Sequence, residues 1–302
     1  MFSKPNPSLT ARKFPLGSAL ALIGAGALAL APGSAWAGRG SSPGAIKSAI
    51  ASGSVDAISA ELERSEQLVC GGCVNDVKPL VDSPDPRIRK VATWWLSRRG
   101  LRSELFIEMA TRLGQPDSRK AEAAADVLGG LRTSKAIEPL GAALNNPLFD
   151  GSARAAMAAA LGRIGDQAAV PALAQGAKDA DAQVRAAALG ALRELRGTIP
   201  VASVIEHLGD SDEGVRIEAI YSLGATRGVG IDAAARSSAT LALVQIVKDD
   251  VRPRVRRKAV WALGEIHGDA GLASSTLSAA MGADTDPAVR SLAAVALSKL
   301  GQ

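Results

Sequence analysis

The sequence predicts an all-α protein: an α-solenoid of about seven stacked helix pairs with an N-terminal helical cap. Three observations predict it. A helix-forming pattern recurs seven times, and the second residues of the copies stand at 89, 121, 154, 185, 216, 256 and 290. A spacing of 31 to 40 residues is typical of stacked repeats. Leucine stands at the same place in every copy, and no stretch has the alternation and the β-branched side chains of a strand.

Each copy predicts an amphipathic helix, here named the B helix. If the first residue of a copy is position 0, position +4 is alanine in all copies but one, and position +8 is always leucine. Positions 0, +4 and +8 share one helical face. We therefore expect the small residue at +4 to admit a neighbouring helix and the leucine to fill the space behind it. The seven leucines are Leu96, Leu128, Leu161, Leu192, Leu223, Leu263 and Leu297.

An aspartate at position −3 begins most B helices. It accepts hydrogen bonds from the free amides of a first helical turn, so we expect it to be an N-cap. These aspartates are Asp85, Asp117, Asp150, Asp181, Asp212 and Asp286, and the sixth unit has Arg252 instead. Six units also carry arginine at +1. That arginine can pair within its own helix or reach the aspartate of the next repeat.

A shorter apolar segment, the A helix, precedes the B helix in each unit. Expected examples are residues 136–144, 170–177, 199–208 and 233–247. Proline stands near the start of three of them, at Pro139, Pro171 and Pro200, where a missing amide donor costs least. The alternation of A and B helices predicts a continuous stack.

The pattern Asp-x-x-Val-Arg-x-x-Ala-x-x-x-Leu-Gly in Asp212–Gly224 resembles the short HEAT-like repeats named after phycobilisome lyases. The resemblance covers about residues 70–301. It implies an armadillo/HEAT-like superhelix that contacts other proteins. Some members of this family are enzymes, so catalysis has to be tested against the residues of this chain.

The N-terminal residues 1–37 have the pattern of a secretory signal peptide. Basic residues precede the apolar run 14–31, and Ala35-Trp36-Ala37 forms a cleavage pattern before Gly38. A retained membrane anchor is the alternative, although the run is short and rich in glycine. We expect cleavage, a periplasmic or secreted protein, and no stable membrane span after signal removal.

The mature chain is close to neutral. The whole sequence has 35 basic and 30 acidic residues, and the signal holds three of the basic ones, which leaves 32 against 30. A balance of this kind does not favour nucleic acid as a partner. We expect three segments: the signal peptide at 1–37, a linker with N-terminal capping helices at 38–69, and the HEAT-like solenoid at 70–302. Within the second segment, residues 45–51 and 55–62 should be the capping helices.

The two cysteines form the motif Cys70-Gly71-Gly72-Cys73. A haem attachment site would require histidine at the position of Val74, and a zinc site would require two more nearby ligands. A structural disulfide in an oxidising compartment and a redox-active pair both remain open. We expect the structural bridge, because two glycines allow so short a loop to close.

The residues of common catalytic sites are absent. The chain has two histidines, His207 and His267, and neither precedes glutamate as in the metal-dependent hydroxylases of this architecture. It has no glycine-rich phosphate loop and no Gly-x-Ser-x-Gly motif. The sequence therefore predicts no catalytic, cofactor or metal site and no enzymatic activity.

Position +6 of the B helix carries the expected partner-binding residues. It points about 150° away from the core positions, toward the concave face on which B helices of HEAT-like stacks lie. Its occupants are Trp94, Asp126, Ala159, Gly190, Tyr221, Trp261 and Val295. Aromatic residues grouped with arginine are the usual anchors of an interface. The expected patch on units four to six consists of Arg193, Tyr221, Arg257 and Trp261, and Lys90 with Trp94 forms a second contact near the other end.

The densest basic run, residues 252–258, adds an electrostatic argument. Five of its seven residues are cationic, at a helix start where cations oppose the helix dipole. This arrangement favours an acidic partner segment. The predicted function is an exported scaffold that binds a protein or peptide on its concave face without catalysis, and the alternative is a thiol–disulfide protein that uses Cys70 and Cys73.

Overall fold

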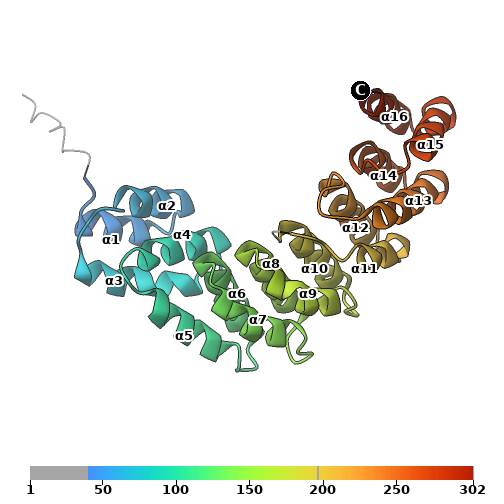
Figure 1. The fold of residues 1–302 in the computed structure, drawn as a ribbon. Helices are drawn as coiled ribbons and strands as arrows, with labels where there is room; N and C mark the ends of the chain where they lie inside the picture. Colours follow the sequence, from blue (N-terminus) through green and yellow to red (C-terminus); the bar gives the residue numbers. More distant parts are fainter. Residues whose placement is uncertain (1–39, 196, 302) are drawn as a thin grey trace, which may run out of the picture. The chain divides into compact units, whose positions relative to one another are not determined.

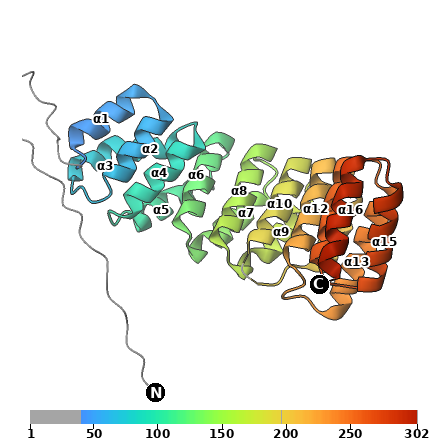
Figure 2. The ribbon, with the colours of Figure 1, turned by 90° about the horizontal axis from the view of Figure 1, so that it is seen from above.

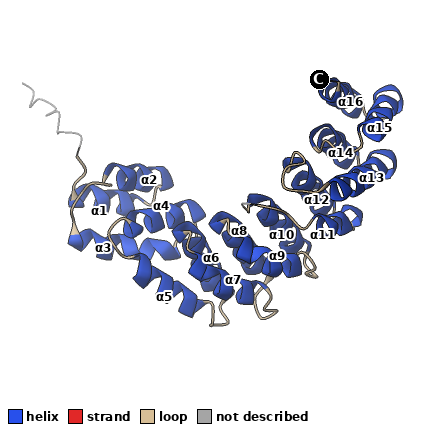
Figure 3. Ribbon diagram, in the orientation of Figure 1, coloured by secondary structure: helices blue, strands red, loops and turns tan. Residues whose placement is uncertain are grey.

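The computed structural model describes residues 40–301 with the exception of Arg196. The expected signal peptide, residues 1–37, lies outside the described residues. Within the described part the chain is entirely helical and contains no strand, as Figure 3 shows. The predicted all-α class is confirmed.

The helices alternate between an A row and a B row (Figure 1). The A helices are α1 (Pro43–Ser52), α3 (Gly71–Val77), α5 (Arg102–Arg112), α7 (Ile137–Leu144), α9 (Val170–Gly176), α11 (Val201–Glu206), α13 (Ala233–Asp249) and α15 (Ala270–Ala283). The B helices are α2 (Val55–Arg64), α4 (Pro86–Ser97), α6 (Ser118–Leu131), α8 (Gly151–Ile164), α10 (Ala182–Glu194), α12 (Glu213–Ala225), α14 (Pro253–Glu265) and α16 (Pro287–Leu300). Short 3₁₀ segments extend some A helices, at Lys78–Asp82, Ser134–Ala136, Gln167–Ala169 and His207–Gly209.

Each B helix packs against the next B helix along the whole stack, from α2 to α16. Figure 2 shows these helices side by side. The pair α1–α2 is the predicted N-terminal cap, and α2 packs on α4 in the same way as the later B helices pack on each other. The prediction of seven units and a cap is therefore confirmed, with the cap built as a further helix pair.

The buried positions confirm the register taken from the sequence. All seven residues at +4 have no exposed surface, and the leucines at +8 are buried in units one to six. Leu297 in the last unit is only half-buried, because no following B helix in the described chain covers α16. The buried side chains form one continuous apolar core that runs through all the repeats.

The aspartates at −3 cap the B helices as expected. Each accepts a hydrogen bond from a backbone amide of the first turn, for example Val215 N to Asp212 Oδ1 at 3.0 Å. The exception is also confirmed, because Arg252 makes no side-chain cap at the start of α14. That helix begins with Pro253, which has no amide hydrogen to satisfy.

A ladder of ion pairs connects successive repeats. In four units the arginine at +1 pairs not with a capping aspartate but with an aspartate at position −5 of the next unit, whereas Arg89 of unit one pairs with Glu122 and Asp126 of α6. The pairs are Arg154–Asp179 at 2.9 Å, and Arg185–Asp210, Arg216–Asp250 and Arg256–Asp284 at 2.8 Å. We name this set the arginine ladder. It resolves the open alternatives of the sequence in favour of contact between repeats.

Each step of the ladder also fixes the loop before a B helix. Asp210 accepts a hydrogen bond from the amide of Asp212, and Arg216 donates to the carbonyl oxygen of Asp210 at 2.8 Å. Burial raises the pKa of Asp210, but hydrogen bonds from Arg185 and from the amide of Asp212 outweigh burial and bring the pKa below its usual value. The hydrogen bond from Arg256 likewise lowers the pKa of Asp284.

Candidate functional site: the B-helix face

A hollow lies on the B-helix row, where α4, α6 and α8 meet, and the start of α5 also lines it. Its volume is about 700 Å³. We name it the basic hollow. Its lining consists of Pro86, Arg87, Lys90, Trp94, Ser97, Arg98, Arg102, Asp126, Gly129, Gly130, Arg132 and Arg163.

Positive charge dominates the lining, with six cationic side chains and one carboxylate, Asp126. Three of the cations have a carboxylate partner: Arg87 with Asp85, Arg98 with Glu66, and Arg163 with Asp126. Lys90, Arg102 and Arg132 have none among the described residues. The hollow thus keeps unneutralised cations at its wall.

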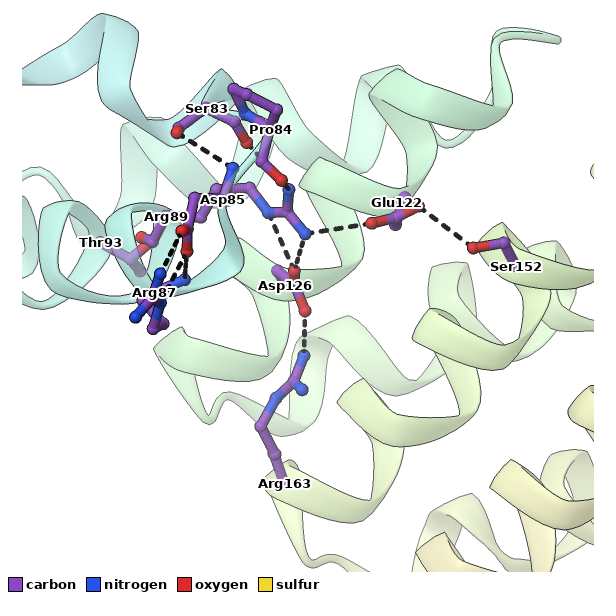
Figure 4. Close-up of polar contacts among 10 residues, drawn as sticks. All are labelled: Ser83, Pro84, Asp85, Arg87, Arg89, Thr93, Glu122, Asp126, Ser152 and Arg163. Carbon is purple, nitrogen blue, oxygen red and sulfur yellow. Dashed lines mark hydrogen bonds and ion pairs between the residues drawn. The ribbon is translucent and has the colours of Figure 1, made fainter. Parts of the chain in front are cut away.

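Figure 4 shows a polar network around Arg89, and two of its members, Asp126 and Arg163, line the basic hollow. The side chain of Arg89, only 5% exposed, donates to both Asp126 and Glu122 and to the backbone carbonyl of Ser83. Asp126 also accepts a hydrogen bond from Arg163 of the next B helix at 2.8 Å. One carboxylate therefore connects α4, α6 and α8, and it holds the Arg163 guanidinium at the rim.

Trp94 stands between the basic hollow and a second one. The guanidinium carbon of Arg98 lies 5.2 Å from the centre of the Trp94 ring, a cation–π distance. The second hollow, of about 550 Å³, shares Arg87, Lys90 and Trp94 with the first. It is also lined by Ser59, Glu63, Glu66 and Val91. The predicted contact of Lys90 and Trp94 is thus the border between two hollows.

An aromatic cluster occupies the B-helix row on units four to six. The rings of Tyr221 and Trp261 are tilted at 58° with centroids 5.2 Å apart. Arg193 lies 5.7 Å from the centre of the Tyr221 ring and pairs with Glu218 at 2.9 Å. The structure therefore brings three of the four expected patch residues together.

Arg257 does not join this cluster through any contact with the rings. Its recorded ion pair is with Asp286 of the next unit, at 3.5 Å. Lys258, which the sequence analysis did not single out, lies 4.6 Å from the centre of the Tyr221 ring and donates to the tyrosine hydroxyl. The signal for Lys258 was its place three residues before Trp261, one turn away on the same helix.

Position +6 is less exposed than the helical geometry predicted. Trp94, Tyr221 and Trp261 are all half-buried. A methyl group added at Gly224 would lie 2.6 Å from the Trp261 ring, so the indole covers the preceding B helix at that glycine. Side chains at +6 therefore have one side on a neighbouring helix and the other toward solvent.

The basic run 252–258 is largely neutralised by the fold. Arg254 lies 3.9 Å from Glu213, and Arg256 and Arg257 pair with carboxylates of the following unit. Lys258 donates to Tyr221. Arg252 and Lys258 have no acidic partner within the described residues. Through Arg256 and Arg257, the run contributes contacts between repeats.

The cysteine pair lies at the start of α3. The sulfur atoms of Cys70 and Cys73 are drawn within bonding distance, 2.01 Å apart, and Cys73 is buried against the core. The oxidation state of the pair in the protein stays a prediction. The residues around it are helical, so the βαβ setting of thioredoxin-like enzymes is not found in the described part of the chain.

The two histidines lie on different units. His207 is buried, and burial lowers its pKa although Asp210 acts in the opposite direction. His267 is exposed, with a left-handed backbone at φ 49°. Across residues 40–301, Arg196 excepted, no three His, Cys, Asp or Glu side chains gather as a group that could hold a metal ion.

The comparison with protein families identifies the type of repeat. The family described as HEAT repeats matches residues 104–193, 148–224, 170–241 and 240–302. The matches together span residues 104 to 302, about two thirds of the chain. This chain belongs to the HEAT-repeat family. The narrower assignment to the phycobilisome-lyase type stays a prediction.

Solved structures of HEAT and armadillo type are similar in fold. The Escherichia coli protein YibA is 18% identical, with 85% of this chain and 91% of that chain covered and a TM-score of 0.50. Kap95p, solved with RanGDP, is 11% identical, with 75% and 36% covered and a TM-score of 0.51. This HEAT-repeat chain thus corresponds to about a third of Kap95p.

The phycocyanin lyase complex of CpcE and CpcF from Nostoc sp. PCC7120 is 20% identical over 53% of this chain and 98% of that chain, with a TM-score of 0.44. Comparison with curated protein sequences gave no significant match. Among the helices of the described residues, none combines the length and the apolar character needed to cross a bilayer.

Proposed function

We propose that this chain is an exported HEAT-repeat scaffold that binds a protein or peptide partner on its concave B-helix face and has no catalytic activity. The fold supports the binding function, because stacked repeats offer long surfaces for partners and Kap95p, a neighbour in fold, binds RanGDP. The pattern of residues 1–37 supports export to the periplasm or the cell exterior.

The observation that carries the proposal is the half-exposed pair Tyr221 and Trp261 on the B row. The same position holds Ala159 and Gly190 in units three and four, so the packing of B helices does not require an aromatic residue there. Tyrosine and tryptophan beside arginine are the residues that contribute most to interfaces. Arg193 is such an arginine, because it lies 5.7 Å from the centre of the Tyr221 ring.

The test compares partner capture by matched variants. Residues 38–302 are immobilised, and proteins that bind from the envelope fraction of the producing cell are quantified by mass spectrometry. The variant Tyr221→Ala/Trp261→Ala should lose its specific partners. The control is Ile107→Ala/Leu241→Ala, which removes exposed apolar side chains from two A helices and should leave capture unchanged.

Thermal unfolding distinguishes loss of binding from loss of structure. We expect the melting midpoint of the aromatic variant to stay within a few degrees of the parent. Capture that survives the double substitution would place the binding surface elsewhere. Unfolding of the double variant would show that the two rings belong to the core, and it would equally contradict the proposal.

A further inference from the structure

We propose that the basic hollow binds an extended acidic segment of the partner protein, with carboxylates of that segment held by Lys90, Arg102 and Arg132. This inference rests on the proposed function and names the chemistry of the partner. It also moves the acidic contact away from the basic run 252–258, whose cations are engaged with Glu213, Asp284 and Asp286.

The first argument is the imbalance of charge. Lys90, Arg102 and Arg132 line the hollow without a carboxylate partner among the described residues. Grouped cations repel one another, so an unneutralised group costs free energy that an anionic ligand would recover. Acidic side chains of a partner would supply the missing charge.

The second argument is that the fold holds two of these cations in place at the hollow. Arg102 donates to the backbone carbonyl of Leu131, which holds its side chain across the end of α6. Arg132 follows directly and has a left-handed backbone at φ 49°, a conformation in which glycine is the usual residue. The same conformation recurs at Arg227 and His267 after two later B helices, so the end of the B helix sets the direction in which the chain leaves α6 at Arg132.

Guanidinium groups favour carboxylates as ligands. An arginine presents two parallel N–H donors that match the two oxygens of a carboxylate. Arg163 pairs with Asp126 at the wall. Arg102 and Arg132 have no carboxylate partner among the described residues, so they are available to a ligand. The Trp94 ring adds an apolar surface on which a side chain of the segment can pack.

The two hollows give the bound segment a direction. Both include Lys90 and Trp94, and the one toward α2 carries Glu63 and Glu66. Like charges placed opposite one another are unfavourable. We therefore infer that the segment crosses Trp94, with its acidic residues over Arg102 and Arg132 and neutral or basic residues over α2.

The local character of the charge favours an acidic peptide over nucleic acid. Residues 40–302 contain 31 basic and 30 acidic residues, since four of the 35 basic residues precede them. A nucleic-acid surface requires a basic track that follows many phosphates. Here the hollow holds six cations and one carboxylate, and the rest of residues 40–302 contains 25 basic and 29 acidic residues.

The test measures the binding of fluorescein-labelled synthetic peptides to residues 38–302 by fluorescence anisotropy. The probe alternates glutamate with serine and glycine around one leucine, and the control peptide replaces every glutamate with glutamine. We expect the acidic probe to bind at least about tenfold more tightly than the control, and we expect added salt to weaken it. Single-stranded DNA and heparin serve as competing polyanions.

Two variants locate the contact without risk to the fold. Lys90→Gln removes an exposed charge, and Arg132→Gly relieves the left-handed position. Together they should weaken the acidic probe by about tenfold or more, while Lys90→Arg should retain binding. Lys248→Gln, an exposed lysine on α13, is the matched control and should have no effect. Trp94→Phe should remove most of the change in intrinsic tryptophan fluorescence on binding.

Three results would overturn the inference: equal binding of both peptides, binding that Lys90→Gln/Arg132→Gly leaves intact, or tighter binding of DNA or heparin than of the acidic peptide. The same variant is then used in the capture experiment. If Lys90→Gln/Arg132→Gly still captures the partner and Tyr221→Ala/Trp261→Ala does not, the inference of an acidic segment is rejected and the proposed function stands. Full capture by both variants would reject the proposed function as well.

Discussion

The leucine at +8 is the residue whose size matters most to the packing of one repeat on the next. Leu192 has no exposed surface and lies in the continuous core. We predict that Leu192→Ala lowers the free energy of unfolding by about 2–5 kcal/mol, because it removes buried methyl groups and leaves a cavity. Urea unfolding followed by circular dichroism measures the change.

An exposed leucine provides the matched control. Leu241 on α13 is 60% exposed, so Leu241→Ala should change the free energy of unfolding by less than about 0.5 kcal/mol. If Leu192→Ala had an effect as small as this, the assignment of +8 to the repeat junction would be wrong.

At the scale of residues, the sequence predicts those features that follow from the periodicity of a single helix. Position +4, position +8 and the capping aspartates all follow from the geometry of a single helix, and the structure confirms them. Arg132 and Arg163 were not predicted as parts of a site. They line the same hollow as Trp94, and this placement depends on how one B helix is rotated against the next, which the repeat pattern does not encode.

At the scale of elements, the arginine ladder connects the repeats that apolar packing alone would leave free to slide. Arg185 and Asp210 are largely buried, with side chains 14% and 10% exposed. We predict that Asp210→Asn costs about 1–3 kcal/mol of unfolding free energy, because the guanidinium is left without its counter-charge. A double-mutant cycle with Arg185→Gln should give a coupling energy of about 1–3 kcal/mol.

The ladder also predicts how stability depends on pH. The pKa values of Asp210 and Asp284 are lowered from 3.8 in the folded chain. Their contribution is therefore complete above pH 3.8 and is lost as the pH falls through the folded pKa values. Asp210→Asn/Asp284→Asn should show a weaker loss of stability in this acid range than the parent. Equal acid sensitivity, or a coupling energy near zero, would contradict the ladder.

The aspartate at −5 had a signal in the sequence that was not used. Asp-x-Asp stands before three B helices, at Asp179–Asp181, Asp210–Asp212 and Asp284–Asp286. The second aspartate of each motif is the N-cap. The first accepts a hydrogen bond from the amide of the second, and its pairing with an arginine of the preceding repeat shows only when the repeats are stacked.

The short helix α3 carries the prediction about the cysteines. We expect Cys70 and Cys73 to be bridged in the exported protein, with a structural role. A maleimide reagent should label neither sulfur in the denatured protein before reduction and both after it. Labelling of both without a reductant would show that the bridge is absent, and insulin reduction that is lost in Cys70→Ser would favour the redox alternative.

At the scale of the whole molecule, the repeat period was sufficient to predict the stack and its order. The position of the hollows was not predictable from it, because a hollow arises where large side chains such as Trp94 stand beside glycines of a neighbouring helix, Gly129 and Gly130. The expected patch was found in part, since Arg193, Tyr221 and Trp261 meet and Arg257 pairs elsewhere.

Export is a property of the whole chain. We predict that the protein recovered from the envelope or the medium begins at Gly38, because Ala35 and Ala37 are the well-placed small residues after the apolar run. Intact mass spectrometry decides the point. A mass that retains residues 1–37 would favour the membrane-anchored alternative.

The central claim is that a partner binds on the B-helix face, and site-specific photo-crosslinking tests it most directly. A photoreactive amino acid replaces Lys90 or Ala159 on B helices, or Gln175 or Leu241 at exposed positions of A helices. After irradiation in the producing cell, the account predicts that the same partner protein is crosslinked from residues 90 and 159 and not from residues 175 and 241. Crosslinks from the A-helix positions, with none from the B-helix positions, would contradict it.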